Sequence, residues 1–180
     1  MAEWLTSALD LRPGMRVLDL GCGRATSSIF LHREFGVQVW ATDLWFSAAE
    51  NGQRIRDAGV EDSVFPVHAD ARSLPFSDEF FDVIVSLDSF YYYGTDDLYL
   101  NYLAQFVRPG GAIGIAGLAS CKKSTALFRN IFAIGGRTIS GACTLHPGGD
   151  ATGSAPTLWT SRSRIRCRTV ASSGWTGTGS

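Results

Sequence analysis

The sequence predicts an α/β protein with a doubly wound parallel sheet, on two observations. Between Met15 and Ala116, short apolar runs that suit buried strands alternate with stretches whose apolar residues recur at helical spacing. Glycines and polar residues follow the ends of the apolar runs, where sheets of this kind bind their ligands. Right-handed crossovers then join the strands.

The elements follow one another in a regular order. MRVLDL at residues 15–20 is an apolar run that ends in glycines, as in a strand buried on both faces. The helix after it begins near Thr26 or Ser27, either of which can cap it, and ends at Gly36. The full prediction is strands at 15–20, 37–43, 64–68, 81–87 and 112–116, helices at 26–35, 47–58 and 96–107, and the strand order 3-2-1-4-5.

Charge divides the chain near Gly117. Residues 1–117 hold 8 Lys and Arg against 16 Asp and Glu, and residues 118–180 hold 8 against 1. The acidic part argues against nucleic acid as an obligatory partner, because phosphate binding needs clustered positive charge. The length suits one domain with a core of its own.

Other classes of protein lack support in the sequence. The first ten residues do not resemble a signal peptide, and no uninterrupted apolar window of about 18 residues could span a membrane. The four cysteines form no CxxC pair and have no histidine at zinc-ligand spacing, so we expect neither a metal nor a disulfide framework. We expect a cytoplasmic protein of unknown oligomeric state.

The turn after the first strand, LDLGCGRATS, is the first candidate ligand site. Gly21 and Gly23, on either side of Cys22, allow the backbone to approach a ligand closely. Asp19 at the end of the strand repels a pyrophosphate and suits a cation such as S-adenosylmethionine, although a loop hydrogen bond would also explain it. Thr26 stands where a dinucleotide fingerprint has its third glycine.

Two more strand ends carry carboxylates. Asp43 lies 20 residues beyond Gly23, where a carboxylate can accept both ribose hydroxyls. Leu44, together with Trp45, could pack against an adenine or simply belong to the core. Asp70 could accept from an adenine amino group while the backbone N–H of Ala71 or its neighbour donates to the ring.

The fourth strand ends in VSLDSFYYYG. Ser86, Leu87 and Asp88 are expected beside the reacting centre, with the aromatic residues along its rim. A tyrosine there could hold a cation through its ring or offer a hydroxyl to a substrate, although aromatic clusters more often form core. The candidates for a catalytic base are Asp88, Tyr91 and Tyr92.

Four segments in order, VLDLGCG, VWATDLW, HADARSLPFSDEFFDVIVSLDSF and FVRPGGAIGIA, resemble the motifs of class I S-adenosylmethionine-dependent methyltransferases, especially the small-molecule "type 11" group. The resemblance covers residues 11–117 and implies a Rossmann-like fold. By it, Asp19, Gly21 and Gly23 contact or orient the methionine part of the cofactor, Asp43 the ribose, and Asp70 and Ala71 the adenine. Residues 86–88 would face the methionine end and the methyl acceptor.

The expected activity is methyl transfer from S-adenosylmethionine to a small-molecule or lipid-like acceptor. The reaction is an in-line displacement in which positioning does most of the work, so it needs neither a metal nor a covalent nucleophile. Two alternatives stay open: a non-catalytic fragment that binds the nucleoside, and a nicotinamide-dependent oxidoreductase. Asp19 and the missing third glycine argue against the second.

Residues 118–180 do not supply the helix and antiparallel hairpin that the resemblance implies, so we expect strands six and seven to be missing or irregular. In a shifted frame the codons of PGGDATGSAPTLWT permit WWRRHWERTDSVD, and later codons permit an alternating strand and PDG. We therefore divide the chain into a cofactor-binding domain, 1–117, and a tail, 118–180, translated out of frame or disordered. The tail should be mobile or poorly packed, with the fifth strand left as an exposed edge. Arg without Lys before Gly117 agrees with a high-GC bacterial gene.

Overall fold

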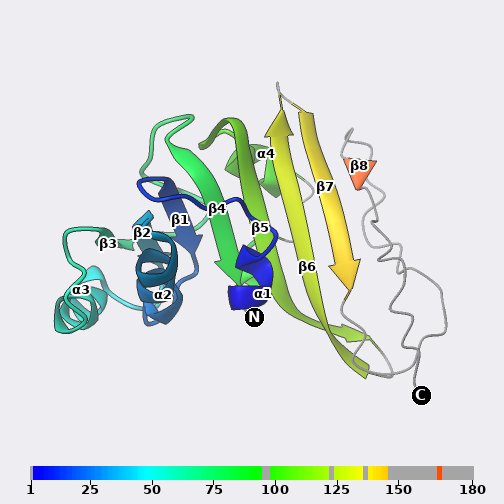
Figure 1. Cartoon of the computed structure of the whole chain (residues 1–180). Coiled ribbons are helices and arrows are strands. Elements are labelled where there is room, and N and C mark those ends of the chain that lie inside the picture. The colour runs from blue at the N-terminus through cyan, green and yellow to red at the C-terminus, as the bar shows by residue number, and fades with distance from the viewer. Residues whose placement is uncertain (1, 95–97, 122–123, 136–137, 146–165, 168–180) are drawn as a thin grey trace, which may run out of the picture.

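The computed structural model describes residues 2–94, 98–121, 124–135, 138–145 and 166–167. Within them one sheet runs in the order β3-β2-β1-β4-β5-β6-β7-β8 (Figure 1). The strands are β1 Arg16–Leu20, β2 Gln38–Asp43, β3 Val64–His68, β4 Phe81–Leu87, β5 Val107–Cys121, β6 Ser124–Gly135, β7 Thr138–Leu145 and β8 Arg166–Cys167.

The first five strands confirm the predicted order 3-2-1-4-5. β1 lies between β2 and β4, and all pairings from β3 to β5 are parallel. Asp19 on β1 is in register with Ala41 on β2 and Val85 on β4, so the residues that follow these strands emerge at one edge of the sheet. The motif-bearing turns therefore gather at that edge, as such sheets require.

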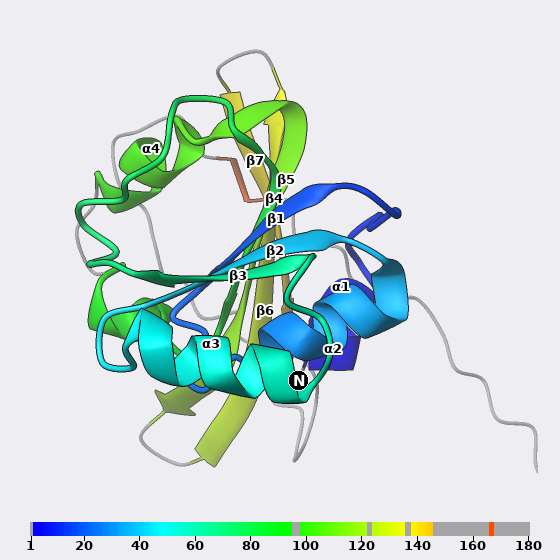
Figure 2. The ribbon, with the colours of Figure 1, turned by 90° about the vertical axis from the view of Figure 1, so that its left-hand side faces the viewer.

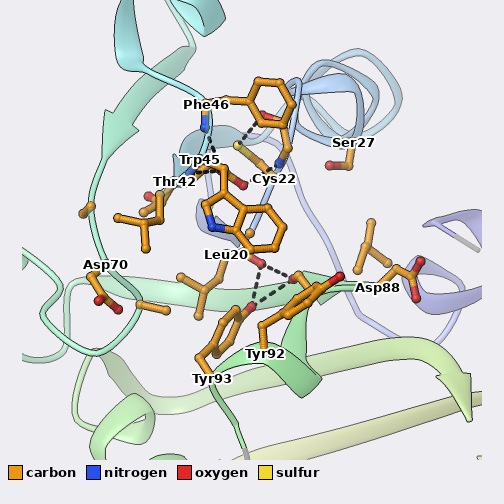
Figure 3. Close-up of a pocket in the computed structure, with 18 of the residues that line it drawn as sticks. Leu20, Cys22, Ser27, Thr42, Trp45, Phe46, Asp70, Asp88, Tyr92 and Tyr93 are labelled. Atoms are coloured by element: carbon orange, nitrogen blue, oxygen red, sulfur yellow. Dashed lines mark hydrogen bonds between the residues drawn. The ribbon is translucent and has the colours of Figure 1, made fainter.

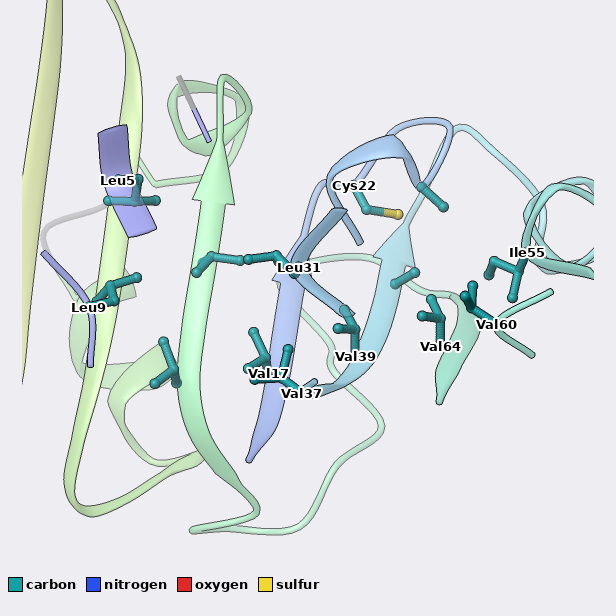
Figure 4. Close-up of a cluster of buried hydrophobic side chains, with 14 of the residues drawn as sticks. Leu5, Leu9, Val17, Cys22, Leu31, Val37, Val39, Ile55, Val60 and Val64 are labelled. Atoms are coloured by element: carbon teal, nitrogen blue, oxygen red, sulfur yellow. The ribbon is translucent and has the colours of Figure 1, made fainter. Parts of the chain in front are cut away.

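Helices cover both faces of the parallel part of the sheet. α1 Ala2–Thr6, α2 Thr26–Phe35 and α3 Ala48–Asp57 lie on one face, and α4 Tyr99–Ala104 lies on the other (Figure 2). Each face has its own apolar core. Leu5, Leu31 and Ile55 from the three helices pack over Val17 and Val39 (Figure 4). Leu100 and Leu103 from α4 pack with Leu18 and Ile84.

Local sequence explains where two of the helices begin and end. α2 matches the predicted range, and Gly36 ends it at φ 65°, a left-handed conformation that glycine adopts without strain. Ser47 begins α3 through a capping box, in which its side chain accepts from the Glu50 N–H and the Glu50 carboxylate accepts from the Ser47 N–H. The expectation that Thr26 or Ser27 caps α2 is wrong, because Ala25 is the N-cap and no side chain caps the helix.

The segment after Gly117 corrects the sequence analysis. β6 and β7 are present as antiparallel strands, and β5 pairs with β6 along residues 112–121, so β5 is not an exposed edge. The β6 sequence STALFRNIFAIG contains Thr, Phe and Ile, which favour strands. That the tail is mobile or poorly packed stays a prediction, and its residues 146–165 and 168–180 lie outside those described.

The predicted helix at 96–107 is also too long. α4 spans six residues, and Val107 already belongs to β5, whose register against β4 shifts between Phe81 and Val83. Among the described residues, no helix has the length and apolar character needed to cross a membrane.

Candidate functional site

A cleft of about 550 Å³ opens at the carboxyl ends of β1 to β4 (Figure 3). It brings together most of the predicted site residues. The predicted residues that line it are Gly21, Cys22, Gly23, Asp43, Leu44, Asp70, Ala71, Leu87, Asp88, Tyr91 and Tyr92. Asp19 and Ser86 do not line the cleft, because both side chains are fully buried beneath it.

The glycine turn after β1 is tied to the neighbouring elements through its backbone. The N–H groups of Gly21 and Cys22 both donate to the Thr42 carbonyl, at 2.9 and 3.1 Å. Gly21 has φ 73°, and a Cβ there would lie 2.3 Å from the Ser89 hydroxyl oxygen. Buried Asn51 on α3 donates to the Gly23 carbonyl at 2.9 Å. The turn therefore needs glycine at position 21.

Asp43 organises the middle of the cleft. One carboxylate oxygen accepts from the Gly23 N–H at 2.8 Å, and the other accepts from the N–H groups of Trp45 and Phe46 at 2.7 and 3.0 Å. The carboxylate thus joins the end of β2 to the glycine turn. Carboxylate oxygens can each accept more than one hydrogen bond, so Asp43 keeps capacity for ligand hydroxyls.

Asp19 lies under the same turn. Its Oδ2 accepts from the hydroxyls of Ser27 and Ser28, both at 2.6 Å, and its Oδ1 has no hydrogen-bond partner. Burial raises the pKa of Asp19 to about 6, an effect that the two serine hydroxyls oppose and the nearby Asp43 carboxylate reinforces. The cleft therefore has a buried carboxyl group beneath it, in addition to the carboxylates that line it.

The loop after β3 forms one end of the cleft. Asp70 Oδ1 accepts from the Arg72 N–H at 2.8 Å, and the Tyr99 hydroxyl donates to the Ala71 carbonyl at 2.9 Å. The Arg72 guanidinium donates to the Tyr92 carbonyl at 3.1 Å across the opening. Figure 3 shows Asp70 and Asp88 on opposite sides of the Trp45 ring.

Exposed apolar side chains concentrate at the mouth of the cleft. Of the five large apolar side chains exposed in the described part of the chain, four line this cleft: Leu44, Trp45, Tyr91 and Tyr92. The Trp45 and Tyr92 rings meet edge to face, with centroids 4.9 Å apart. Asp88 beside them has φ 53°, and its N–H donates to the Ala116 carbonyl on β5.

Comparison with known proteins identifies the family. The sequence model of the methyltransferase domain matches residues 17–111. The chain belongs to this family. The expected class I S-adenosylmethionine-dependent methyltransferase fold is thereby confirmed.

Relatives of this methyltransferase domain share its first two thirds. Methyltransferase GfsG of Streptomyces halstedii is 34% identical over 119 residues, which cover 66% of this chain and 43% of that protein. The chain thus spans less than half the length of this relative.

Two solved structures are also similar. A candidate sarcosine dimethylglycine methyltransferase from Galdieria sulphuraria is 26% identical at TM-score 0.59, and the match covers 65% of this chain and 45% of that protein. Geranyl diphosphate C-methyltransferase from Streptomyces coelicolor, in complex with S-adenosyl-L-homocysteine, is 25% identical at TM-score 0.59, over 66% and 45%.

Thr42 and Ser89 belong to the methyltransferase domain's cleft but are not among the residues predicted from the sequence, and Tyr93, expected along the rim, lies in the floor. Thr42 lines the cleft with a buried hydroxyl that has no partner. Ser89 and Tyr93 form its floor with Leu20, and both contact the buried Ser86 beneath it. A signal for the floor was available, because Ser86 is a polar residue inside the apolar strand FDVIVSL. Among the described residues, no group of three or more metal-ligating side chains comes together.

Proposed function

We propose that this chain binds S-adenosylmethionine in the cleft and transfers its methyl group to a small-molecule or lipid-like acceptor. The observation that carries the proposal is the charge of the cleft. Asp43, Asp70 and Asp88 line it and Asp19 lies beneath it, whereas the cleft-lining Arg72 has its guanidinium directed to the Tyr92 carbonyl. Such a site favours a cationic nucleoside over a pyrophosphate.

The residues present fit the cofactor. Asp43, held by three backbone N–H groups, is the acceptor for the ribose hydroxyls, and Asp70 with the Ala71 N–H is the pair for the adenine edge. Leu44 offers an apolar surface for the adenine ring. The glycine turn and Leu87 face the methionine part, with the buried Asp19 carboxylate supporting the cationic end from below.

When bound, S-adenosylmethionine supplies an electrophilic methyl carbon on a sulfonium. An acceptor atom held in line with this carbon would take the methyl group, and the electron pair of the broken carbon–sulfur bond would stay on sulfur. The chain's residues align the two partners and receive any proton that the acceptor loses. A hydrogen bond with Tyr92 raises the pKa of Tyr91 to about 12, so Tyr91 stays protonated near neutral pH. This favours Asp88 over Tyr91 as the base.

The mouth of the cleft supports an acceptor with apolar surface. Trp45, Tyr91 and Tyr92 are each exposed by about half or more, and contiguous exposed apolar groups around a cleft mark a binding surface. The similar methyltransferases named for geranyl diphosphate and for sarcosine dimethylglycine fit the proposed range of acceptors. The cytoplasmic location, the bacterial origin and the absence of a nucleic-acid partner stay predictions.

Calorimetric titration of the full chain with S-adenosylhomocysteine, and separately with NAD, tests the cofactor. We expect saturable binding of S-adenosylhomocysteine and none of NAD at the same concentrations. Saturation by NAD alone would overturn the proposal in favour of an oxidoreductase.

A second assay separates an enzyme from a non-catalytic binder. The chain is incubated with S-adenosylmethionine labelled on the methyl group, and with a panel of phenolic, fatty-acid, isoprenoid and amine acceptors. Transfer of label to at least one acceptor, lost in Asp43→Ala, is the expected result. Cofactor binding without transfer to any of the panel would favour a nucleoside-binding fragment.

A further inference from the structure

The peptide group between Leu20 and Gly21 is held at both ends. Its N–H belongs to Gly21 and donates to the Thr42 carbonyl at 2.9 Å, at the end of β2. Its carbonyl belongs to Leu20 and accepts from the hydroxyls of Ser89 and Tyr93, at 2.9 and 3.0 Å, in the turn after β4. The plane of this peptide, which begins the glycine turn, is therefore fixed from the strands on both sides of β1 (Figure 3).

The hydroxyl cluster that holds the carbonyl is buried and closed. Ser86 is fully buried, and Ser89 and Tyr93 are each 9% exposed. Their oxygens lie 2.9 Å apart for Ser86 and Ser89, 2.8 Å for Ser86 and Tyr93, and 3.0 Å for Ser89 and Tyr93. Burial raises the pKa of the Tyr93 hydroxyl above its ordinary value, so the cluster stays neutral.

Only the two bonds to the Leu20 carbonyl have a fixed direction, because a carbonyl oxygen can only accept. Three hydroxyls bring three protons to five oxygen–oxygen contacts. When Ser89 and Tyr93 donate to the Leu20 carbonyl, Ser86 is left to donate to one of them. No hydroxyl proton then remains for a ligand, so the task of the cluster is to hold the backbone rather than to exchange protons with a substrate.

The same turn carries the aromatic rim. η1 Phe90–Tyr92 follows Ser89, and the exposed rings of Tyr91 and Tyr92 stand at the cleft mouth while Ser89 and Tyr93 point to β1. Gly21 has no room for a Cβ against Ser89, so the turn and the glycine loop are in direct contact.

We propose that Ser89 and Tyr93, supported by Ser86, are positioning residues that set the Leu20–Gly21 peptide for cofactor binding and join the cofactor turn to the acceptor rim. The inference rests on the proposed function, because it assumes that the glycine turn meets the cofactor. On this inference, the affinity for the cofactor depends on side chains after β4 as well as on the glycine turn.

Tyr93→Phe tests the inference, with Tyr102→Phe as the matched control. Each substitution removes one hydroxyl from a tyrosine that bonds a backbone group, Leu20 O in the first case and the Leu74 N–H in the second, and Leu74 lies outside the cleft. The dissociation constant for S-adenosylhomocysteine and the midpoint of thermal unfolding are measured for both. We expect Tyr93→Phe to weaken binding roughly three- to tenfold, as for the loss of one hydrogen bond, and Tyr102→Phe to leave it within about twofold.

A double-mutant cycle sharpens the result. Ser89 and Tyr93 donate to one carbonyl, so either can partly replace the other, and Ser89→Ala with Tyr93→Phe leaves that carbonyl without a side-chain donor. We expect the double variant to lose more affinity than the product of the single losses, by roughly threefold or more. If the two substitutions acted through independent packing effects, the loss of affinity in the double variant would equal the product of the two single losses.

The outcomes are distinguishable. Equal affinities for Tyr93→Phe and Tyr102→Phe, at equal shifts in unfolding temperature, would show a structural role only and overturn the inference. Failure of the unmodified chain to bind S-adenosylhomocysteine would overturn the proposed function itself. Should the double variant not fold, the comparison of the two single tyrosine variants decides the matter.

Discussion

At the scale of single residues, Asp43 connects more of the cleft than any neighbouring side chain does. Its carboxylate joins the glycine turn and the loop after β2 through three backbone hydrogen bonds. Asp88 lines the cleft from the turn after β4, across the Trp45 ring from Asp70 (Figure 3). The two carboxylates should therefore differ in what they contribute.

We expect Asp43→Ala to weaken S-adenosylhomocysteine binding by at least about tenfold, since a hydrogen bond to a charged group contributes about 1.5 to 3 kcal/mol. Asp88→Ala, the matched carboxylate removal, should change the affinity less because Asp88 lies nearer the acceptor. Calorimetry at one pH and salt concentration compares the two. An unchanged affinity for Asp43→Ala would contradict the ribose assignment.

Asp19 makes stability depend on pH. Burial raises its pKa from 3.8 to about 6 in the folded chain, so folding favours the protonated carboxyl. This contribution to the free energy of unfolding is fully present below about pH 4 and is lost as the pH rises through about 6, a difference of about 3 kcal/mol. Asp19→Asn should lack that fall. Denaturant unfolding between pH 4 and pH 8 measures it.

Asp10→Asn is the control for this titration. Asp10 is exposed, and its hydrogen bond with Arg12 lowers its pKa, so its small contribution is present at neutral pH and is lost on acidification, the opposite sign. A profile of Asp19→Asn that parallels the unmodified chain from pH 4 to pH 8 would contradict the assignment of the fall to Asp19.

Sequence could predict the cleft's carboxylates but not its floor. Asp43, Asp70 and Asp88 each follow an apolar run, and the carboxyl ends of parallel strands meet at one edge, so their assembly follows from topology alone. The bonds of Ser89 and Tyr93 to Leu20 span 69 and 73 residues and depend on how η1 folds back onto β1. No periodicity in the sequence encodes that contact.

At the scale of elements, two glycines distinguish the effect of conformational strain from the effect of close contact. Gly21 and Gly14 have similar φ values, 73° and 81°, but an added Cβ meets Ser89 at 2.3 Å in the first case and nothing within 4 Å in the second. The two positions therefore form a natural pair for substitution by alanine.

We expect Gly14→Ala to lower the free energy of unfolding by about 1 kcal/mol, the cost of a left-handed alanine. Gly21→Ala adds displacement of Ser89, so it should destabilise the chain more and also weaken cofactor binding. Denaturant unfolding and calorimetry of both variants measure this. Equal destabilisation with unchanged affinity in both would show that the turn tolerates a side chain at position 21.

The sequence predicts the helices and strands well where the hydrophobic period ends at a residue that breaks or caps the element. The ranges of α2, β3 and β4 match because each is bounded by a glycine, a largely polar loop or a change of period. β6 is not predicted because its apolar residues are followed by a long segment rich in Gly, Ser and Thr, which does not resemble a strand. In the structure β6 pairs with β5, which leaves β5 without an unpaired edge.

At the scale of the whole molecule, the proposed boundary near Gly117 lies within β5, where the balance of charge changes. The match to the methyltransferase domain ends at Gly111, and the balance of charge reverses after Gly117. β5 continues to Cys121 and its antiparallel partner β6 begins at Ser124, whereas the resemblance implies a helix before the final hairpin. These observations support the proposal that residues 118–180 are read out of frame.

Resequencing the gene from the codon for Gly117 onward tests this proposal directly. We expect one inserted or missing base, and a corrected frame that encodes WWRRHWERT followed by an alternating strand and PDG. The forced codon of Trp159 followed by the first two bases of Thr160 fixes an aspartate in that frame.

The corrected protein should unfold at a higher temperature than the present chain, because its added helix and hairpin would bury apolar surface against the sheet. A confirmed present frame, with a corrected-frame protein that is less stable and binds S-adenosylhomocysteine no better, would show that residues 118–180 are a genuine part of this methyltransferase.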